Sequence, residues 1–92
     1  MKVGVIGSGG REHAICTSLK KSKNIDKIYC FPGNAGTSFI AENIEIELNN
    51  FEELKRVIKE LGIDIVIVGP EKPLVDGIVD FLELNNIKVF GP

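Results

Sequence analysis

The chain has 92 residues, of which 43% are hydrophobic and 26% charged; this is typical of one small globular domain and excludes an intrinsically disordered tail. Eleven Lys and Arg are scattered among thirteen Asp and Glu, and the net charge is -2, so no basic stripe is available to bind nucleic acid. No apolar run approaches the roughly 20 residues of a membrane span and no secretory signal is recognisable, so we expect a cytoplasmic protein with no membrane partner.

The first stretch of the chain is a short apolar run followed by glycines. Lys2–Ile6 predicts a buried strand, Gly7-Ser8-Gly9-Gly10 predicts a tight turn, and residues 10–21 predict a helix. The apolar spacing predicts a buried helix face made of Ala14, Ile15, Ser18 and Leu19.

A glycine turn that leads into a helix start leaves main-chain N–H groups free to bind an anion. We therefore expect the Gly9 and Gly10 amides to bind a phosphate. Arg11 pairs either with that phosphate or with a surface acid. Glu12 interacts with the helix dipole or contacts a substrate, and we favour the first. His13 packs and orients the loop or acts as a general base, and again we favour the first.

A second strand and glycine loop follow. Lys27–Phe31 is rich in residues that favour strands, and Pro32–Thr37 is typical of a loop. Asn34 and Thr37 either bind a sugar or phosphate or close the loop through their own backbone. The alternation of apolar and acidic residues over Ile44–Leu48 predicts a third strand at an edge of the sheet.

The second half of the chain repeats the alternation of helix and strand. Asn50 and Glu53 have the spacing of a capping box, and Gly62 is placed to end that helix. Ile63–Val68 predicts a strand buried on both faces, beside the first strand. The buried stripe of the helix comprises Phe51, Leu54, Val57, Ile58 and Leu61.

The last elements are a helix and a short strand. Pro73 suits the first turn of a helix that Asn85-Asn86 ends, and Ile87–Phe90 predicts the fifth strand. The inward-facing residues of this helix are expected to be Leu74, Val75, Ile78, Val79 and Leu82.

Five strands alternating with helices predict an α/β fold, a three-layer Rossmann-like domain over residues 1–92 with a parallel sheet in the order 3-2-1-4-5. In such sheets ligands bind beyond the carboxyl ends of the strands, at the switch point between the first and fourth strands. The three turns Gly7–His13, Pro32–Thr37 and Gly69–Leu74 should therefore face one crevice.

Glu71 is the acid best placed to bind a ligand, because it follows the central strand between two prolines. Its carboxylate can accept two hydroxyl donors from a ribose, or it is simply an acid at a helix N-terminus. No cluster of metal ligands and no complete catalytic set is visible. The two cysteines, Cys16 and Cys30, lack a CxxC spacing, and we expect reduced, buried thiols.

Binding of a dinucleotide is the first alternative. The G-x-G-x-x-G/A fingerprint begins at Gly7, but Glu12 replaces its third small residue. The fingerprint also requires an acid at the end of the second strand, where this chain has Phe31-Pro32-Gly33. Both departures argue against NAD, whereas a phosphate site at the glycine turn survives them.

Four stretches resemble the N-terminal domain of the phosphoribosylamine–glycine ligase (glycinamide ribonucleotide synthetase) family. They are V-I-G-S-G-G-R-E-H at 5–13, P-G-N-A-G-T at 32–37, V-G-P-E-K-P-L-V-D-G at 68–77 and F-G-P at 90–92. The resemblance covers the whole chain in order and spacing, and it implies the pre-ATP-grasp version of the Rossmann-like fold.

The resemblance implies a substrate-side domain of an ATP-dependent ligase of purine synthesis, which joins 5-phosphoribosylamine and glycine. ATP and Mg or Mn are then held by an ATP-grasp unit further along the chain, with no catalytic or metal residue in this segment. The alternatives are a nucleotide-binding or dinucleotide-binding module and a structural docking domain of another ATP-grasp enzyme. The implied substrate-binding residues are Gly9, Gly10, Arg11, Asn34, Gly36, Thr37 and Glu71.

Overall fold

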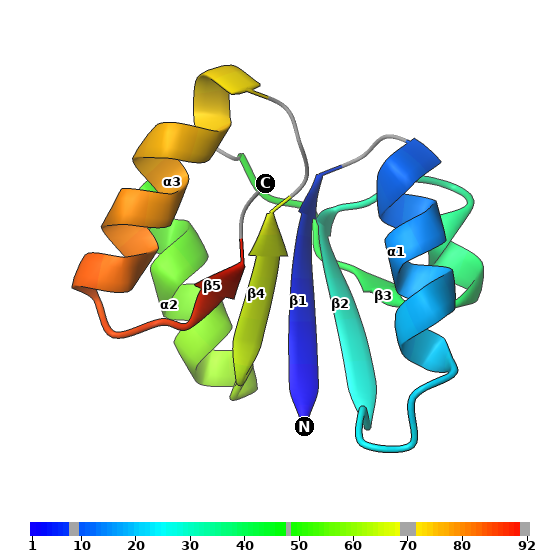
Figure 1. The fold of residues 1–92 in the computed structure, drawn as a ribbon. Helices are drawn as coiled ribbons and strands as arrows, with labels where there is room; N and C mark the ends of the chain where they lie inside the picture. The colour runs from blue at the N-terminus through cyan, green and yellow to red at the C-terminus, as the bar shows by residue number, and fades with distance from the viewer. Residues whose placement is uncertain (8–9, 48, 69–71, 91–92) are drawn as a thin grey trace.

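The computed structural model describes residues 1–7, 10–47, 49–68 and 72–90, and for residues 10–11 and 72–76 it describes the backbone only. Its sheet has five parallel strands in the order β3-β2-β1-β4-β5, which confirms the predicted fold class and strand order (Figure 1). The elements are β1 Lys2–Gly7, α1 Gly10–Lys20, β2 Lys27–Pro32, the 3-10 helix η1 Thr37–Phe39, β3 Glu42–Asn43, α2 Phe51–Leu61, β4 Ile65–Val68, α3 Lys72–Leu84 and β5 Val89–Phe90.

Strand β1 lies at the centre of the sheet and sets the position of the neighbouring strand ends. Ile6 pairs with Phe31 on β2 and with Val68 on β4, and Gly7 pairs with Pro32. The carboxyl ends of three adjacent strands therefore lie at one edge of the sheet, at the top of Figure 1. The strand order reverses between β1 and β4, so the predicted switch point is confirmed.

The two faces of the sheet are covered by different helices (Figure 1). Ile6 contributes to the core under α2 and α3, whereas Val3 and Val5 contribute to the core under α1. We call these two sides the α2–α3 face and the α1 face. The buried residues of the α2–α3 face are Ile6, Tyr29, Phe31, Ile46, Leu54, Ile58, Val66, Val68, Ile78, Leu82 and Ile87. Those of the apolar cluster on the α1 face are Val3, Val5, Cys16, Ile28 and Cys30.

Helix α2 forms as its sequence predicts. The Asn50 side-chain oxygen accepts a hydrogen bond of 3.2 Å from the Glu53 N–H, which confirms the N-cap. At the other end, Gly62 has φ 70° and its N–H donates to Ile58 and Lys59 carbonyls. The buried side chains Leu54 and Ile58 lie one turn apart on the stripe that the periodicity predicted.

The prediction for the third strand was wrong in its position. Only Glu42 and Asn43 pair with β2, and the Ile44 N–H still donates to the Cys30 carbonyl at 2.7 Å. In a parallel ladder the Ile44 carbonyl would next accept from residue 32, but Pro32 has no N–H, so the pairing ends. The alternation that follows reflects side chains directed at the α2–α3 core, where Ile46 is buried.

The predicted buried face of α1 was wrong for two of its four residues. Ala14 and Ser18 are exposed, whereas Glu12 and Cys16, one turn apart, are almost completely buried. Periodicity missed this face because α1 carries few large apolar residues, and a glutamate is not expected in a core. The apolar residues of α1 that are half-buried are Ile15 and Leu19.

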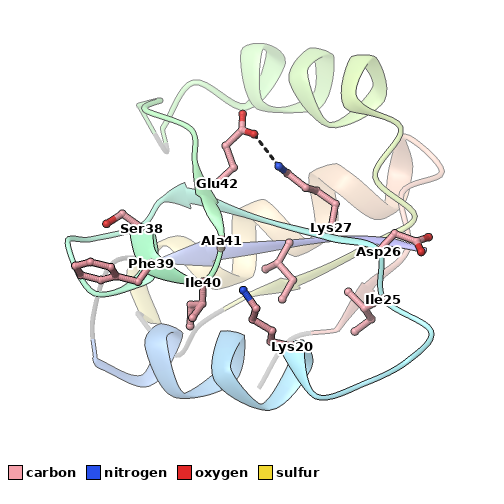
Figure 2. Close-up of a pocket in the computed structure, with 10 residues that line it drawn as sticks. Lys20, Ile25, Asp26, Lys27, Ser38, Phe39, Ile40, Ala41 and Glu42 are labelled. Atoms are coloured by element: carbon pink, nitrogen blue, oxygen red, sulfur yellow. Dashed lines mark ion pairs between the residues drawn. The ribbon is translucent and has the colours of Figure 1, made fainter.

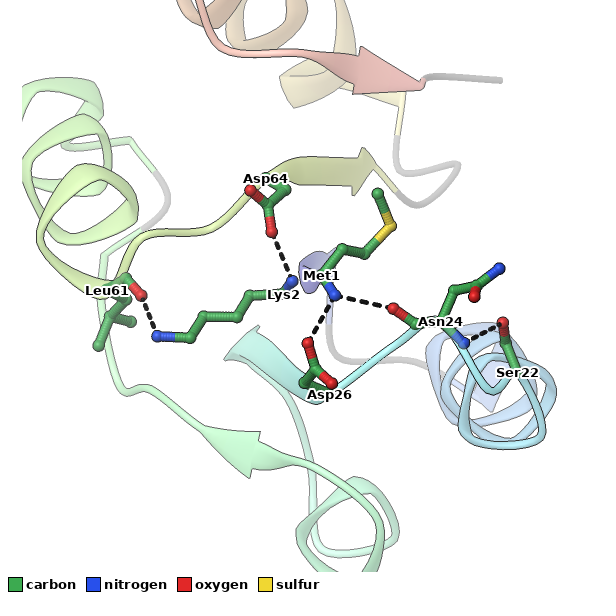
Figure 3. A network of polar contacts seen from close by, with 7 residues as sticks. All are labelled: Met1, Lys2, Ser22, Asn24, Asp26, Leu61 and Asp64. Carbon is green, nitrogen blue, oxygen red and sulfur yellow. Dashed lines mark hydrogen bonds and ion pairs between the residues drawn. The ribbon is translucent and has the colours of Figure 1, made fainter.

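Polar contacts hold the amino ends of β1 and its neighbours together, at the edge of the sheet opposite the carboxyl ends of the strands (Figure 3). The Met1 ammonium lies 2.7 Å from an Asp26 carboxylate oxygen, and the Lys2 ammonium donates to the Leu61 carbonyl at 3.0 Å. The hydrogen bond from the N-terminal ammonium lowers the pKa of Asp26. Asp64 accepts from the Lys2 N–H at 2.7 Å, so the start of β1 is tied to both of its neighbours.

Candidate functional site at the carboxyl ends of the strands

A hydrogen bond joins the loops that follow β1 and β2. The Gly33 N–H donates to the Gly7 carbonyl at 3.1 Å. Gly33 has φ 78°, and a Cβ built on it would collide with the Asn43 side chain and with the Thr37 hydroxyl. Glycine is therefore the residue that fits both the positive φ and the small space at position 33.

The loop after β2 is closed by its own polar groups. The Asn34 N–H donates to the Thr37 hydroxyl at 2.8 Å, and the Thr37 N–H donates to the Asn34 side-chain oxygen at 2.9 Å. Asn43 supports the same turn, accepting from the Thr37 hydroxyl and donating to the Asn34 carbonyl, each at 2.8 Å. Thr37 is 0% exposed, so its side chain stabilises the loop from within.

Helix α1 contacts this second loop through His13. A Cβ added to Gly36 would lie 3.1 Å from the His13 Cδ2 and 3.2 Å from the Asn34 Oδ1. His13 is exposed, and its imidazole therefore lies against the outer surface of the loop after β2. The first turn of α1 and the loop Pro32–Thr37 are thus adjacent, as the topology predicted.

Glu12 is a residue of this region whose burial the sequence did not predict. It is 1% exposed, and its Oε1 is buried without a hydrogen-bond partner. Gly7, at φ 142°, makes room for it, because a Cβ there would overlap the Glu12 carboxyl group. The signal in the sequence was the glutamate at the place where dinucleotide-binding turns have a small residue.

The predicted ligand residues are described to different degrees. Gly10 and Arg11 form the first two positions of α1, while Gly9 and Glu71 lie outside the described residues. The third turn is bounded by Val68, at the end of β4, and by Lys72, at the start of α3. Asn34, Gly36 and Thr37 share one loop, and the binding roles of all seven residues stay predictions.

A hollow of about 550 Å³ lies elsewhere, beside the beginnings of β2 and β3 and the end of α1 (Figure 2). An ion pair of 3.1 Å between Lys27 and Glu42 spans part of it, and Phe39, 84% exposed, stands at its margin. The sequence did not indicate this hollow, because its lining comes from three separate segments.

Two kinds of feature do not occur among residues 1–7, 10–47, 49–68 and 72–90. Among these residues, no group of three or more His, Cys, Asp or Glu side chains is arranged to hold a metal ion. None of the described helices is both long and apolar enough to cross a membrane.

Comparison with known proteins identifies the family. The family model described as Phosphoribosylglycinamide synthetase, N domain, matches residues 1–92. The chain belongs to this family. The resemblance inferred from the glycine turn and the two later loops is therefore confirmed.

Relatives of this N domain are longer proteins. The phosphoribosylamine–glycine ligase of Caldanaerobacter subterraneus subsp. tengcongensis is 53% identical over 92 residues, which cover 100% of this chain and 22% of that protein. The ligase of Clostridium acetobutylicum is 45% identical over the same shares. The trifunctional purine biosynthetic protein adenosine-3 of Chironomus tentans is 46% identical over 99% of this chain and 7% of that protein. The chain thus spans about a fifth of the ligases it matches.

Solved structures agree with the fold of this N domain. The phosphoribosylamine–glycine ligase of Thermotoga maritima matches 100% of this chain and 19% of that chain, with a TM-score of 0.66 and 28% identity. Saccharopine dehydrogenase of Saccharomyces cerevisiae matches 98% of this chain and 21% of that chain, with a TM-score of 0.77 and 16% identity, which shows the fold alone.

Proposed function

We propose that this N domain belongs to a phosphoribosylamine–glycine ligase and that its crevice binds the phosphoribosyl group of 5-phosphoribosylamine. The full-length enzyme joins this amine to glycine with hydrolysis of ATP. Family membership supports the reaction, and the adjacent loops after β1 and β2 support the place of binding. The observation that carries the proposal is the hydrogen bond from Gly33 to Gly7, which brings two glycine turns to one strand edge.

Each predicted residue has a role in this proposal. The Gly9 and Gly10 amides, at the start of α1, bind the phosphate together with Arg11, since the N-terminus of a helix favours an anion. The Glu71 carboxylate accepts hydrogen bonds from the ribose hydroxyls. The second wall of the site is Asn34, Gly36 and Thr37, where Thr37 acts as a positioning residue because its hydroxyl is buried in the turn.

ATP and its Mg or Mn ion are assigned to the remainder of the ligase. A metal that binds ATP needs convergent oxygen ligands, and no such cluster occurs among the described residues. The described part of this domain therefore does not fit the metal.

A dinucleotide is the weaker alternative for the same crevice. Strand β2 ends in the buried Phe31 and in Pro32, so no acid stands where ribose hydroxyls of a dinucleotide would bind. The buried carboxyl group of Glu12 also occupies the space against Gly7 that a small third residue would leave open. Both observations favour a phosphoribosyl group over NAD.

The decisive test is Glu71→Gln in the full-length ligase. Loss of a charged hydrogen bond is worth about 1.5–3 kcal/mol, so KM for 5-phosphoribosylamine should rise roughly 10- to 100-fold. KM for glycine and for ATP should stay unchanged. The matched control is Glu83→Gln, which removes the charge of an exposed glutamate on α3.

An unchanged KM for the amine would reject the proposed role of Glu71. Amide chemical shifts of the 92-residue chain, titrated with ribose 5-phosphate, then separate two explanations. Shifts at Gly10, Asn34 and Gly36 would keep the crevice as the phosphoribosyl site with other contacts to the ribose. Their absence at millimolar ligand, together with an unchanged KM, would leave a structural docking domain.

A further inference from the structure

The two cysteines of the chain face each other across the interface between α1 and β2. The Cys16 and Cys30 Sγ atoms lie 3.2 Å apart, and both residues are 0% exposed. They are free thiols, and the chain contains no other cysteine. A disulfide has an S–S distance of about 2.05 Å, so the sulfurs need to approach by only about 1 Å.

The apolar cluster that contains the thiol pair shares residues with the lining of the hollow in Figure 2. Ile28, Ile40 and Ala41 line the hollow, and the same residues belong to or pack against the apolar cluster that contains Cys16 and Cys30. Apolar side chains therefore stand between the sulfurs and the hollow. A small uncharged oxidant crosses such an apolar layer more readily than a bulky or charged one.

We propose that Cys16 and Cys30 are a redox modification site, at which a peroxide converts the two thiols into a disulfide that links α1 to β2. The geometry already holds the partners together, so the second step needs no rearrangement of the fold. The bond would cross-link two elements that carry the loops at the strand ends. This inference does not depend on the identity of the substrate.

The chemistry balances with a peroxide as the oxidant. The Cys30 thiolate attacks one oxygen of hydrogen peroxide, the O–O bond breaks, and the leaving hydroxide takes up a proton to become water. Cys30 is then a sulfenic acid. The Cys16 sulfur attacks the Cys30 sulfur, the S–S bond forms, and the S–O bond breaks to release a second water. Two thiols and one hydrogen peroxide thus give one disulfide and two water molecules.

The surroundings select Cys30 as the attacking group. The hydrogen bond from Cys16 lowers the pKa of Cys30. The same sulfur–sulfur hydrogen bond, together with burial, raises the pKa of Cys16. Cys30 is therefore the thiol that ionises first, and Cys16 stays protonated as the resolving partner.

The test is intact-mass analysis of the 92-residue chain after treatment with hydrogen peroxide and alkylation in denaturant. We expect a monomer about 2 Da lighter than the reduced chain, with no alkyl adduct, and recovery of two adducts after reduction. Two adducts without prior reduction, or sulfinic acid on Cys30 with no disulfide, would overturn the proposal. The same treatment in urea should yield less disulfide and more sulfinic acid, because unfolding exposes both thiols to peroxide and separates them.

A matched control moves the thiol by one residue. The double variant Cys16→Ala/Thr17→Cys keeps two cysteines and nearly the same loop length, but residue 17 is exposed. The wild-type chain should form its disulfide at least about tenfold faster than this variant, since its sulfurs are already in contact. Equal rates in the two chains, or an equal yield of disulfide in urea, would show that the fold does not direct the oxidation.

Discussion

The two faces of the sheet are built in different ways. On the α2–α3 face, Leu54, Ile58, Ile78 and Leu82 are each at most 1% exposed, and the rings of Phe51 and Phe81 lie 5.4 Å apart. This face is an apolar core of large side chains. The α1 face instead combines three β-branched residues with two thiols, and the buried carboxyl group of Glu12 lies against Gly7 at the end of β1.

The α2–α3 face mainly stabilises the fold, whereas the α1 face adjoins the proposed binding site. Apolar burial contributes about 25 cal/mol per Å², so the α2–α3 face, with its larger and more numerous buried side chains, supplies most of the stabilisation from apolar burial. The polar groups under α1 add little to that term, and they lie beside the loops proposed to bind the phosphoribosyl group. The α1 face therefore combines less apolar burial with the residues next to the proposed site.

The largest expected effect comes from Leu54→Ala on the α2–α3 face. Leu54 is 0% exposed, and the cavity should lower the free energy of unfolding by about 2–5 kcal/mol, measured by urea denaturation. Cys16→Ala on the α1 face removes a single sulfur and should cost about 1 kcal/mol. Leu84→Ala, at an 83% exposed position, is the control. Similar losses for Leu54→Ala and Cys16→Ala would break the comparison.

Two glycines, one at the end of α2 and one in the loop after β2, extend the comparison to the backbone. Gly33 and Gly62 both have positive φ, but a Cβ on Gly33 overlaps Asn43, whereas the nearest atom to a Cβ on Gly62 is the Lys2 Nζ at 3.9 Å. Gly62→Ala, at the end of α2, should cost about 1–2 kcal/mol of backbone strain. Gly33→Ala adds a steric clash and should cost about 2–4 kcal/mol. Equal costs in thermal or urea unfolding would mean that the Gly33 loop adjusts freely.

The sequence predicted the fold class, the strand order and the ends of α2, because apolar periodicity, a capping box and a terminal glycine act locally. It misplaced the third strand, because the end of that pairing depends on the missing N–H of Pro32 on another strand. It also misassigned the buried face of α1, where contacts with Gly7 and Cys30 decide burial and the apolar pattern is weak.

For the candidate site, the sequence predicted that the loops after β1 and β2 lie together, because parallel topology alone places them at one edge. It left the role of Thr37 open between a ligand contact and a turn. The structure buries the Thr37 side chain in the turn, where its hydroxyl donates to Asn43. Asn43 also donates to the Asn34 carbonyl, nine residues earlier, and no local sequence pattern contains such a contact.

The smallest expected effect, Glu12→Met, tests whether the α1 face gives up stability. Methionine keeps the length of the side chain and removes the Oε1 atom, which is buried without a hydrogen-bond partner. An unpaired buried polar group costs about 1–3 kcal/mol, so the free energy of unfolding should rise by about 1 kcal/mol after packing losses. Glu83→Met, at an exposed position on α3, should leave stability unchanged and serves as the control. A loss of stability in Glu12→Met alone would show that the carboxyl group is stabilising, and the two faces would then differ in side-chain size only.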